Sequence, residues 1–523
     1  MKYKTKDIKL TVDQFHSENH SQIVADFLKV KKESLDNVSV FKKSVDARRK
    51  NNVHYVVSFV FETKLNLDKN KNVLPMPVQT DFFDNLKQKS ANKKVLVVGS
   101  GSAGLFCALY LAKAGLKPIL IEQGKCVKDR QKDIDKLWHE GVLNQDSNVQ
   151  FGLGGAGTFS DGKLTTSAHN QYVYTVFSQL VKYGAPCEIL TEAMPHVGTD
   201  NLKTVVTNIA EDIKKLGGSV LFETKLTDFY QKKEKTVAII KNNQNTSEIE
   251  VDFVVLAIGH SARDTFSLLN EKGMDISQKA FSVGVRIEHD REMINQARYG
   301  KNYDKQLPVA TYKLATHLPN GRSVYTFCMC PGGQVVLSCS EKESIVTNGM
   351  SFFARNEQNS NSALLVNVLP SDFGSSHPLA GVEFQRKIER DAYKISGSYS
   401  APCQQTVDFL QGKQSTEYGD VLPSIMPKPT PANLENCLPK FVCDALKQAL
   451  PQFGKSIEGF DKSGIITGVE TRSSSPVKLN RNENFATNLP NIFVCGEGSG
   501  YAGGIVTAAV DGLKCAIKLT EMI

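Results

Sequence analysis

Three glycines between two hydrophobic runs near position 100 constrain this chain most strongly. Residues 93–98, KKVLVV, are rich in β-branched side chains and predict a strand. Residues 103–114 are good helix formers and end at a glycine, and residues 117–121 predict a second strand. The motif G-x-G-x-x-G occupies 99–104, between the first strand and the helix. Strand, turn, helix and strand in this order predict an α/β fold with a dinucleotide-binding turn.

Each position of the motif has a mechanical reason. Gly99 permits the tight turn, Gly101 lets the backbone approach a pyrophosphate, and Gly104 lets the helix pack on the sheet. The helix N-terminus then offers free N–H groups and a positive dipole end to phosphates. Glu122 ends the second strand, where its carboxylate is expected to accept hydrogen bonds from the adenosine ribose. Because that carboxylate would repel a 2′-phosphate, NADP is disfavoured at this site.

A membrane span is the alternative interpretation of the same stretch. Residues 95–112 contain no charged side chain, and 18 residues approach the length of a marginal span. The glycines and two serines clustered mid-span argue against insertion, and a ligand-free core helix would not need them. The N-terminus, MKYKTKDIKL, is charged and lacks the apolar core of a secretory signal. We therefore expect no membrane span.

Composition fits a globular protein of several domains. The 523 residues are 41% hydrophobic and 23% charged, and this length suggests about two to four domains. The eleven cysteines are an odd number and include no C-x-x-C pair, so neither a disulfide scaffold nor a zinc site is indicated. We expect a reducing, cytoplasmic setting and no metal.

Positive charge is concentrated near the N-terminus. Residues 1–90 carry 17 Lys and Arg against 11 Asp and Glu, which accounts for most of the net charge of +8. The cluster KKSVDARRK lies at 42–50. It indicates either a patch for RNA, a membrane surface or an acidic partner, or simply the solvated face of a small domain.

Patterning along the rest of the chain suggests the domain order. A helix at 22–30 and a strand at 55–63 predict a small basic α+β module over 1–85, and the proline-containing 74–80 suits a linker. Further on, the sequence predicts elements that alternate as in a sheet covered by helices: a helix at 201–218, strands at 219–230 and 235–242, a single buried strand at 249–259, a strand at 491–495 and a helix at 504–520.

A second glycine-rich segment, TNLPNIFVCGEGSGYAGGIVTAAVDG at 487–512, identifies the dinucleotide. It resembles the closing FAD motif of glutathione-reductase-type flavoproteins, with Glu497 in place of the usual Asp after Gly496. The resemblance implies that this acid hydrogen-bonds the ribityl chain. The helix after Gly503 and Gly504 would point its positive end at the flavin N1/O2 edge.

Two further stretches agree with FAD. VVLAIGH at 254–260 resembles the Ala-Thr-Gly motif of the same superfamily, with Ile258 replacing Thr. The run GLGGAGT at 152–158 occupies the place of the glycine-rich loop that follows the pyrophosphate in related proteins. Together the motifs predict non-covalently bound FAD, contacted by Gly99, Gly101, Ser102, Ala103, Gly104, Glu122, Gln123, Gly154, Gly155, Ala156, Gly157, Thr158, Leu226, Ala257, Gly259, Gly496, Glu497, Gly503, Gly504 and Ile505.

Within this superfamily, the chain resembles a bacterial family described as uncharacterised FAD-dependent dehydrogenases. The stretches that carry the resemblance are NVQFGLGGAGTFSDGKL (148–164), LAIGHSARDTF (256–266), SVGVRIEH (282–289), FCMCPGGQVV (327–336), NGMSFFAR (348–355) and GEGSGYAGGI (496–505). It extends over essentially the whole chain. It implies a FAD-binding oxidoreductase and leaves the substrate unidentified.

The two-dinucleotide disulfide reductases share the FAD fold but are disfavoured. No second G-x-G-x-x-G with flanking strands occurs between 123 and 480, and their C-x-x-x-x-C pair is absent. We expect instead a glutathione-reductase-type Rossmann FAD domain from 90–279 and 463–523, interrupted by an α+β cap or substrate domain at 280–462. NAD(P)H would then act only as a transient electron donor.

The candidate catalytic residues each have a structural alternative. Cys328 and Cys330 project to one face if their segment is extended, as a thiol pair near the flavin or as two small buried side chains. His260 is a candidate proton donor or substrate anchor, or else a helix cap. Arg472 would hold an anionic substrate or a reduced flavin, or else form a structural ion pair.

The sequence thus predicts a FAD-dependent oxidoreductase that passes hydride between an organic small molecule and flavin N5. Two alternatives stay open. One is a flavin-dependent RNA-modifying enzyme that uses the basic N-terminal module, and the other is a non-enzymatic flavin-binding redox sensor. The oligomeric state is not predicted.

Overall fold

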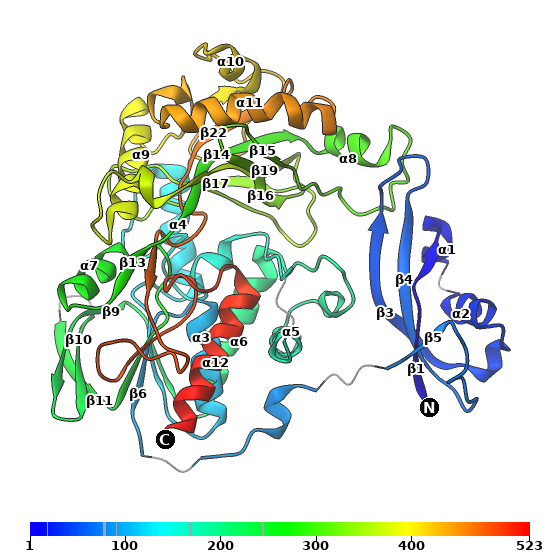
Figure 1. Ribbon diagram of the computed structural model, residues 1–523, viewed down its shortest axis with the longest axis horizontal. Helices are drawn as coiled ribbons and strands as arrows, with labels where there is room; N and C mark the ends of the chain where they lie inside the picture. The colour runs from blue at the N-terminus through cyan, green and yellow to red at the C-terminus, as the bar shows by residue number, and fades with distance from the viewer. Residues whose placement is uncertain (18, 77–79, 90–91, 167–169, 243–244) are drawn as a thin grey trace.

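A computed structural model of the chain describes residues 1–17, 19–76, 80–89, 92–166, 170–242 and 245–523. Figure 1 shows three parts: a parallel sheet flanked by helices, a larger antiparallel sheet above it, and a small N-terminal sheet to one side. The α/β class with a parallel sheet is confirmed. Most of the predicted linker lies in the described residues, but 77–79 lie outside them.

The parallel sheet has a fully buried strand at its centre. Its order is β24 (Ile492–Val494), β12 (Phe253–Leu256), β6 (Val95–Val98), β7 (Ile119–Ile121) and β8 (Ser219–Leu221), all in parallel register. All four residues of β6 are buried. A continuous apolar strand of this kind is expected where both faces of a sheet are covered.

The two faces of β6 belong to two different cores. Val95 and Val97 pack with helices α3 (Ser102–Lys113), α6 (Thr199–Lys215) and α12 (Ile505–Glu521). Leu96 and Val98 pack with the antiparallel meander β9 (Thr224–Lys232), β10 (Lys235–Asn242) and β11 (Asn245–Val251). Strand alternation therefore separates a helical layer from a β layer.

Helix α3 is apolar all round because other elements enclose it. All its residues from Ala103 to Ala112 are buried. The contact with α12 is close enough that a Cβ on Gly512 would lie 2.0 Å from the Ala103 carbonyl oxygen. Helix α5 (Tyr172–Lys182) contributes to the same layer. This enclosure explains how an uncharged run of this length folds without a membrane.

The prediction of one strand over 249–259 is wrong. The run breaks at Asp252, whose carboxylate accepts hydrogen bonds from Lys94 N at 2.8 Å and Lys93 Nζ at 3.1 Å. Strand β11 before the break belongs to the meander, and β12 after it belongs to the parallel sheet. The run 219–230 divides in the same way between β8 and β9, around the left-handed Glu223. An acidic residue, Asp252 or Glu223, thus lies at each point where the chain passes between the parallel sheet and the meander.

The upper part is a seven-stranded sheet. Its order is β15 (Ala315–His317), β16 (Ser323–Cys330), β19 (Asn359–Val368), β14 (Phe281–Asp290), β22 (Ile465–Glu470), β20 (Pro402–Gln405) and β21 (Thr430–Pro431). Helices α9 (Ala380–Ser396) and α11 (Lys440–Ser456) cover its outer face (Figure 1). Its inner face is turned toward the Rossmann part.

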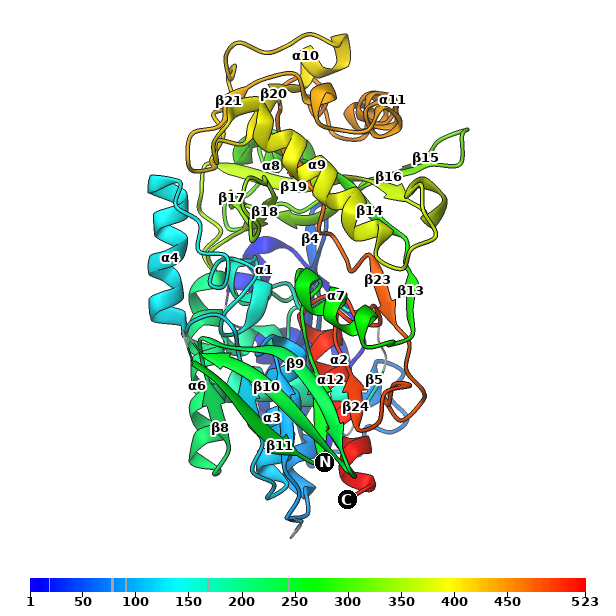
Figure 2. The same ribbon diagram turned by 90° about the vertical axis from the view of Figure 1, so that its left-hand side faces the viewer.

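Smaller elements complete and connect these parts. Strands β13 (Ile276–Gln278) and β23 (Val477–Leu479) pair where the chain crosses between the sheets (Figure 2). The others are β17 (Gln334–Leu337), β18 (Thr347–Met350), α4 (Val127–Glu140), α7 (Arg263–Glu271), α8 (Arg291–Tyr299) and α10 (Thr406–Gln411).

The N-terminal module is a five-stranded sheet backed by two helices. It contains β1 (Lys2–Thr5), β2 (Ile8–Leu10), α1 (Val12–His16), α2 (His20–Leu28), β3 (Asp36–Asp46), β4 (His54–Glu62) and β5 (Val73–Pro75). Strand β3 also meets the Rossmann part, because Lys43 N donates to Thr191 O at 2.8 Å and Ala193 N donates to Lys43 O at 2.9 Å. The side chain of Lys43 pairs with Glu192 at 3.0 Å. These contacts fix the module beside the Rossmann part.

Within the described residues, no helix combines the length and the hydropathy that crossing a membrane requires.

Candidate functional site

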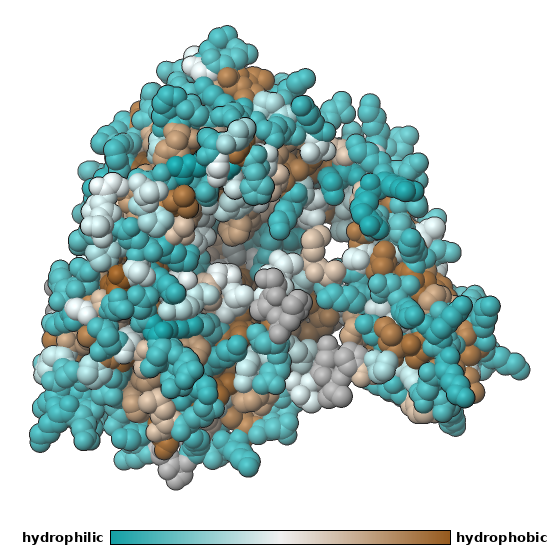
Figure 3. All heavy atoms as spheres, in the orientation of Figure 1, coloured by the Kyte–Doolittle hydropathy of each residue, from teal (hydrophilic) through white to brown (hydrophobic). Residues whose placement is uncertain are grey.

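A cavity of about 1670 Å³ lies where the three parts meet. Its lining includes the glycine turn after β6, the inner face of the upper sheet, and residues 43–48 of the N-terminal module. Figure 3 shows an opening between that module and the body of the molecule. The volume exceeds the 300–1,000 Å³ typical of drug-sized ligand pockets, so there is room for a dinucleotide and a further molecule.

Nearly all the predicted cofactor-contacting residues line this cavity, although their segments lie far apart in the sequence. The exceptions are Gly104, Thr158 and Gly496, which lie behind the lining. A Cβ on Gly104 would lie 1.8 Å from Gly99 O, and one on Gly496 would lie 2.7 Å from the Cβ of Ala103. The Thr158 hydroxyl donates to Leu153 O at 3.1 Å. These residues shape the wall, and their direct contact with a cofactor remains a prediction.

Other glycines of the site have no packing reason among the described residues. A Cβ added to Gly101, Gly259, Gly503 or Gly504 would meet no atom within 4 Å. Each of these glycines lines the cavity. The absent side chains therefore leave space that a closely bound ligand would fill, as the pyrophosphate and flavin of FAD require.

Three helical segments present uncapped N-termini to the same cavity. Helix α3 begins after Gly101, α12 begins after Gly504, and the 3-10 turn Gly155–Phe159 begins after Gly154. The N-cap residue at each start is a glycine and supplies no capping side chain, while the Glu497 carboxyl interacts with the Gly504 backbone at the start of α12. Free N–H groups and a positive dipole end attract phosphate and other anionic groups. The donor set fits a cofactor that carries a diphosphate.

Glu122 is already occupied by protein donors. Its Oε2 accepts from Ser100 N at 2.9 Å and from Ser100 Oγ at 2.8 Å. Its Oε1 accepts from Gly124 N and Gly152 N, both at 2.9 Å. The carboxylate therefore joins the glycine turn to the loop at 152, a role that the sequence did not suggest. A ribose contact stays a prediction and requires the rotatable Ser100 hydroxyl to turn away.

Arg130 binds the backbone of residues 148–155, which lead into the glycine-rich loop. The sequence did not predict this role. Its guanidinium is fully buried and donates to the carbonyl oxygens of Asn148, Val149, Leu153 and Gly155 at 2.8–2.9 Å. Burial lowers the pKa of this guanidinium to about 9. Its position on α4, a polar helix, gave no signal of this role.

Glu497 and Lys279 form the other end of the site. Burial raises the pKa of the Glu497 carboxyl to about 7, against the opposing influence of Lys279 and the Gly504 backbone. Burial likewise lowers the pKa of Lys279. The carboxyl lines the cavity beside the uncapped start of α12. It is placed to bind hydroxyl groups of a ligand.

His260 lines the cavity as a neutral imidazole. Burial, followed by the positive charges of Arg472 and Arg263, lowers its pKa to about 3. The Ser261 hydroxyl lies 3.1 Å from His260 Nδ1. At neutral pH this lowered pKa favours the uncharged imidazole, which can donate or accept a hydrogen bond.

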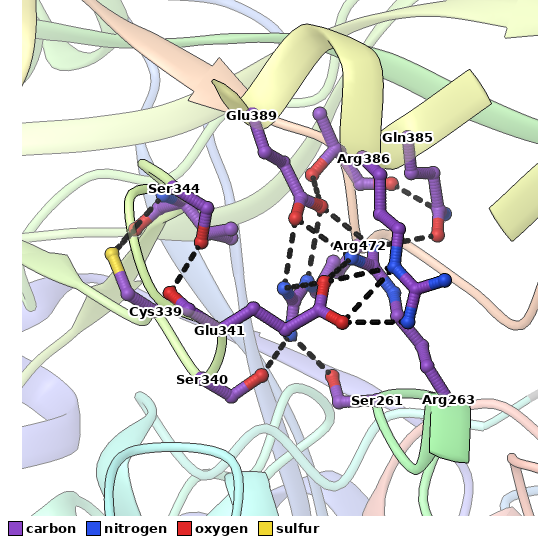
Figure 4. Close-up of polar contacts among 12 residues, drawn as sticks. Ser261, Arg263, Cys339, Ser340, Glu341, Ser344, Gln385, Arg386, Glu389 and Arg472 are labelled. Atoms are coloured by element: carbon purple, nitrogen blue, oxygen red, sulfur yellow. Dashed lines mark hydrogen bonds and ion pairs between the residues drawn. The ribbon is translucent and has the colours of Figure 1, made fainter. Parts of the chain in front are cut away.

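Arg472 belongs to a buried ion-pair network, shown in Figure 4. Its Nη2 lies 2.8 Å from Glu389 Oε2, and Arg263 Nη2 lies 2.7 Å from Glu389 Oε1. The two guanidinium groups hold the pKa of Glu389 well below its usual range, against the effect of burial. The structural alternative for Arg472 therefore accounts for its two hydrogen bonds to Glu389. Ser261 and Ser340 accept its others.

Two successive hydrogen bonds connect this network to the cavity wall. Arg472 Nη1 donates to Ser261 Oγ at 3.1 Å, and Ser261 Oγ donates to Gln150 Oε1 at 3.0 Å. Gln150 and Ser261 both line the cavity, as does Arg472 itself. The network thus positions side chains at the cavity wall beside His260.

Cys328 and Cys330 do not lie on a regular strand, so the expected extended geometry is wrong. The pairing of β16 with β19 shifts register between Phe327 and Cys330. Cys328 adopts a left-handed φ of 44° within this bulge. Cys328 lines the cavity, whereas Cys330 is fully buried.

Two ion pairs near these thiols were not predicted. Lys163 Nζ lies 2.9 Å from Asp161 Oδ2, and Arg286 Nη2 lies 3.0 Å from Glu470 Oε1. Lys163 and Glu470 line the cavity. Asp161 and Lys163 belong to the resemblance stretch at 148–164, which was the available signal.

Family comparisons cover most of the chain. Residues 280–473 match a family described as "FAD-dependent protein, C-terminal domain-like". Residues 93–264 match the family "Pyridine nucleotide-disulphide oxidoreductase", and residues 2–62 match a domain of unknown function. An uncharacterized protein of Clostridium beijerinckii is 44% identical over 508 residues, which cover 94% of each chain.

Solved structures give weaker similarity. A flavoprotein/dehydrogenase from Cytophaga hutchinsonii is 13% identical with a TM-score of 0.34, covering 82% of this chain and 79% of that one. A geranylgeranyl bacteriochlorophyll reductase-like protein from Thermoplasma acidophilum is 14% identical with a TM-score of 0.35, at the same coverage of 82% and 79%.

Proposed function

This chain belongs to the family of FAD-dependent proteins that includes its Clostridium beijerinckii relative, and we propose that it is a FAD-dependent oxidoreductase. In this proposal it passes hydride between an organic small molecule and the flavin. The supporting observation is the convergence of three uncapped helix starts and several sterically unneeded glycines on one cavity. The fold is of the oxidoreductase type, and the substrate is not identified.

The residues divide into an adenosine end and a flavin end. The start of α3 and Glu122 would hold the adenosine diphosphate half, and the loop 152–158 would lie along the pyrophosphate. The start of α12 and Glu497 would hold the ribityl and flavin half. FAD, when bound, supplies the hydride-accepting centre. The helix dipole of α12 would favour negative charge placed at its N-terminus.

The protein side chains would then bind and orient the substrate. Neutral His260 is available to donate or accept one hydrogen bond, and Ser261 fixes its Nδ1 side. Arg472 acts as a positioning residue through Ser261, because its charge is largely taken up by Glu389. The inner face of the upper sheet would exclude water from the remaining volume.

The N-terminal module supports a substrate role more than an RNA role. Its basic stretch lines the cavity through Lys43 and Arg48, and both pair with nearby carboxylates, Glu192 and Asp46. Because these two charges are neutralised locally, they contribute little to a free phosphate-binding surface. We therefore propose that the module closes one side of the substrate chamber.

The visible spectrum of the purified protein tests the proposal. We expect a yellow protein that releases FAD on denaturation, and anaerobic bleaching by NADH, NADPH or a metabolite. A colourless protein that FAD cannot reconstitute would contradict FAD binding. A flavin that only dithionite reduces, and no nicotinamide, metabolite or protein partner, would favour the redox sensor instead.

A further inference from the structure

Two cysteines meet at the bulge in β16, on the inner face of the upper sheet. In a regular strand, residues i and i+2 are about 7 Å apart, which is too far for a disulfide, whose Cβ atoms lie about 3.8 Å apart. At the bulge the strand is irregular, so the regular spacing of about 7 Å does not apply to Cys328 and Cys330. The Cys330 thiol donates a hydrogen bond to Cys328 O at 3.3 Å, so Cys330 Sγ is turned back toward Cys328.

The backbone at Cys328 is strained. Its φ of 44° lies in the left-handed region, which glycine adopts readily and cysteine does not. The conformation directs the Cys328 side chain to the cavity lining while Cys330 stays buried. Strain of this kind tends to persist where the geometry serves a function.

Charged groups around the pair favour a thiolate at one position only. The Cys330 thiol, and then Lys163 and Arg286, hold the pKa of Cys328 well below its usual range, against burial and the charge of Asp161. The pKa of Cys330 is raised well above its usual range by the negative charge on Cys328 and by burial. Burial raises the pKa of Glu470 and Glu497, and the charge of Cys328 adds to this effect. These pKa directions favour the thiolate at Cys328, which lines the cavity, and the protonated thiol at Cys330.

The other buried cysteines behave as ordinary apolar side chains. Burial raises the thiol pKa of Cys107, Cys339, Cys403, Cys437, Cys443 and Cys515. The pKa of Cys495 is raised by the neighbouring Cys515 thiol and then by burial. Thiolates react and buried thiols do not. Reactivity is thus expected at Cys328 and at the exposed Cys187, which serves as an internal reference.

We propose that Cys328 and Cys330 are a redox-active thiol pair that reduces a disulfide-containing substrate admitted to the cavity. A single nucleophile would need only one sulfur, whereas two thiols held at one bulge provide one thiol to attack and one to resolve. The proposal rests on the proposed function for its electrons, because the reduced flavin must regenerate the pair. This thiol chemistry does not need the second dinucleotide domain or the C-x-x-x-x-C motif of the two-dinucleotide disulfide reductases.

Substrate reduction would proceed by two thiol–disulfide exchanges, followed by reduction of the cysteine pair. The Cys328 thiolate attacks one substrate sulfur, the substrate S–S bond breaks, and the leaving thiolate takes a proton. Cys330 then loses its proton and attacks the Cys328 sulfur, which releases the second substrate thiol and leaves a Cys328–Cys330 disulfide. That disulfide gains two electrons and two protons to return to the dithiol, while the reduced flavin returns to its oxidised state.

Mass spectrometry with hydroxyethyl disulfide tests the thiol chemistry in the full chain, with and without added FAD. We expect the wild-type protein to lose two hydrogens at the 328–330 peptide and to keep no adduct there. Cys330→Ser is expected to stop at a mixed disulfide on Cys328. Cys328→Ser should react at this site at least about tenfold more slowly. Labelling of Cys328 no faster than Cys187, or a stable wild-type mixed disulfide, overturns the proposal.

A second measurement couples the pair to the flavin. Protein reduced by dithionite and freed of excess reductant is mixed anaerobically with the same disulfide. Wild-type flavin is expected to reoxidise at least about tenfold faster than in Cys330→Ser. Equal rates overturn the coupling. Failure to bind FAD would refute the proposed function, and the mass shifts would still report on the thiol pair.

Discussion

At the scale of single residues, the site depends on polar side chains that are satisfied internally. Glu122 gathers four donors from the turn and the loop, and Arg130 gathers four carbonyl oxygens from beneath. A buried polar group left without partners destabilises a fold by about 1–3 kcal/mol. Both residues therefore fix the loop conformation before any ligand binds.

Changing Glu122 to Lys should abolish FAD binding. The new ammonium would face four donors that previously met a carboxylate, so the turn at Ser100 and the loop at Gly152 lose their common acceptor. The ratio of flavin to protein absorbance after reconstitution measures the effect. Cys328→Ser is the control and should keep its FAD, since Cys328 lies outside the predicted nucleotide contacts. Full flavin content in the Glu122→Lys variant would contradict this role.

The titration of Glu497 should make the stability of the folded protein fall as pH rises. Its pKa is raised from 4.5 to about 7 in the folded state, so the folded protein binds the proton more tightly than the unfolded chain does. The free energy of unfolding of the FAD-free protein should therefore fall as pH rises through this interval. Thermal melts at pH 5 and 8 should show a smaller loss for Glu497→Gln than for the wild type. An equal loss in both would show that Glu497 titrates normally.

At the scale of elements, local patterns were predictable and long-range ones were not. The turn at 99–104 and its flanking elements follow from neighbouring residues, so the sequence was sufficient. The network around Glu389 joins Arg263 and Arg472, which are 126 and 83 positions away, and no local period encodes such pairs. The bulge at Cys328 depends on pairing with β19, so the extended geometry expected from the sequence failed there.

Two glycines of the same turn should respond to substitution in opposite ways. Gly101→Val places its side chain in open space at a φ of −67° and should fold normally. It should weaken FAD binding at least about tenfold, a loss of about 1.4 kcal/mol. Gly104→Ala drives a Cβ to 1.8 Å from Gly99 O and should lower the melting temperature. Melting curves and FAD titration separate the two effects, and equal melting temperatures would contradict the packing role of Gly104.

The Glu389 network should respond to loss of its central charge. Glu389→Gln removes the buried carboxylate that Arg263 and Arg472 share. It leaves Glu341 as their remaining acidic partner. Breaking a buried ion pair costs about 3–5 kcal/mol. Urea denaturation measures this loss in the free energy of unfolding. Glu383→Gln, on the same helix but exposed, is the matched control and should change stability by less than about 0.5 kcal/mol. A similar small change in both variants would show that the network is not important for stability.

At the scale of the whole molecule, the chamber depends on three parts of the chain. The Rossmann part provides the helix starts, the upper sheet provides the thiols, and β3 of the N-terminal module closes one side. This arrangement was not predictable, because nothing in the local pattern of 1–85 indicates which surface the module contacts. The polar contact with the Rossmann part includes two backbone hydrogen bonds at Lys43 and its ion pair with Glu192. Tyr55 belongs to the same buried apolar cluster as Tyr299 of the upper part.

Charge reversal at two neighbouring lysines distinguishes a chamber wall from a nucleic-acid surface. Lys43→Glu places two carboxylates together where Lys43 now meets Glu192, whereas Lys42→Glu makes the same charge change at an exposed position. If the module closes the chamber, Lys43→Glu should increase iodide quenching of the bound flavin and Lys42→Glu should not. A basic RNA-binding surface would instead lose salt-sensitive RNA affinity about equally in both variants. Unchanged quenching in Lys43→Glu, together with that shared loss of RNA affinity, would favour the RNA-modifying alternative over the small-molecule oxidoreductase.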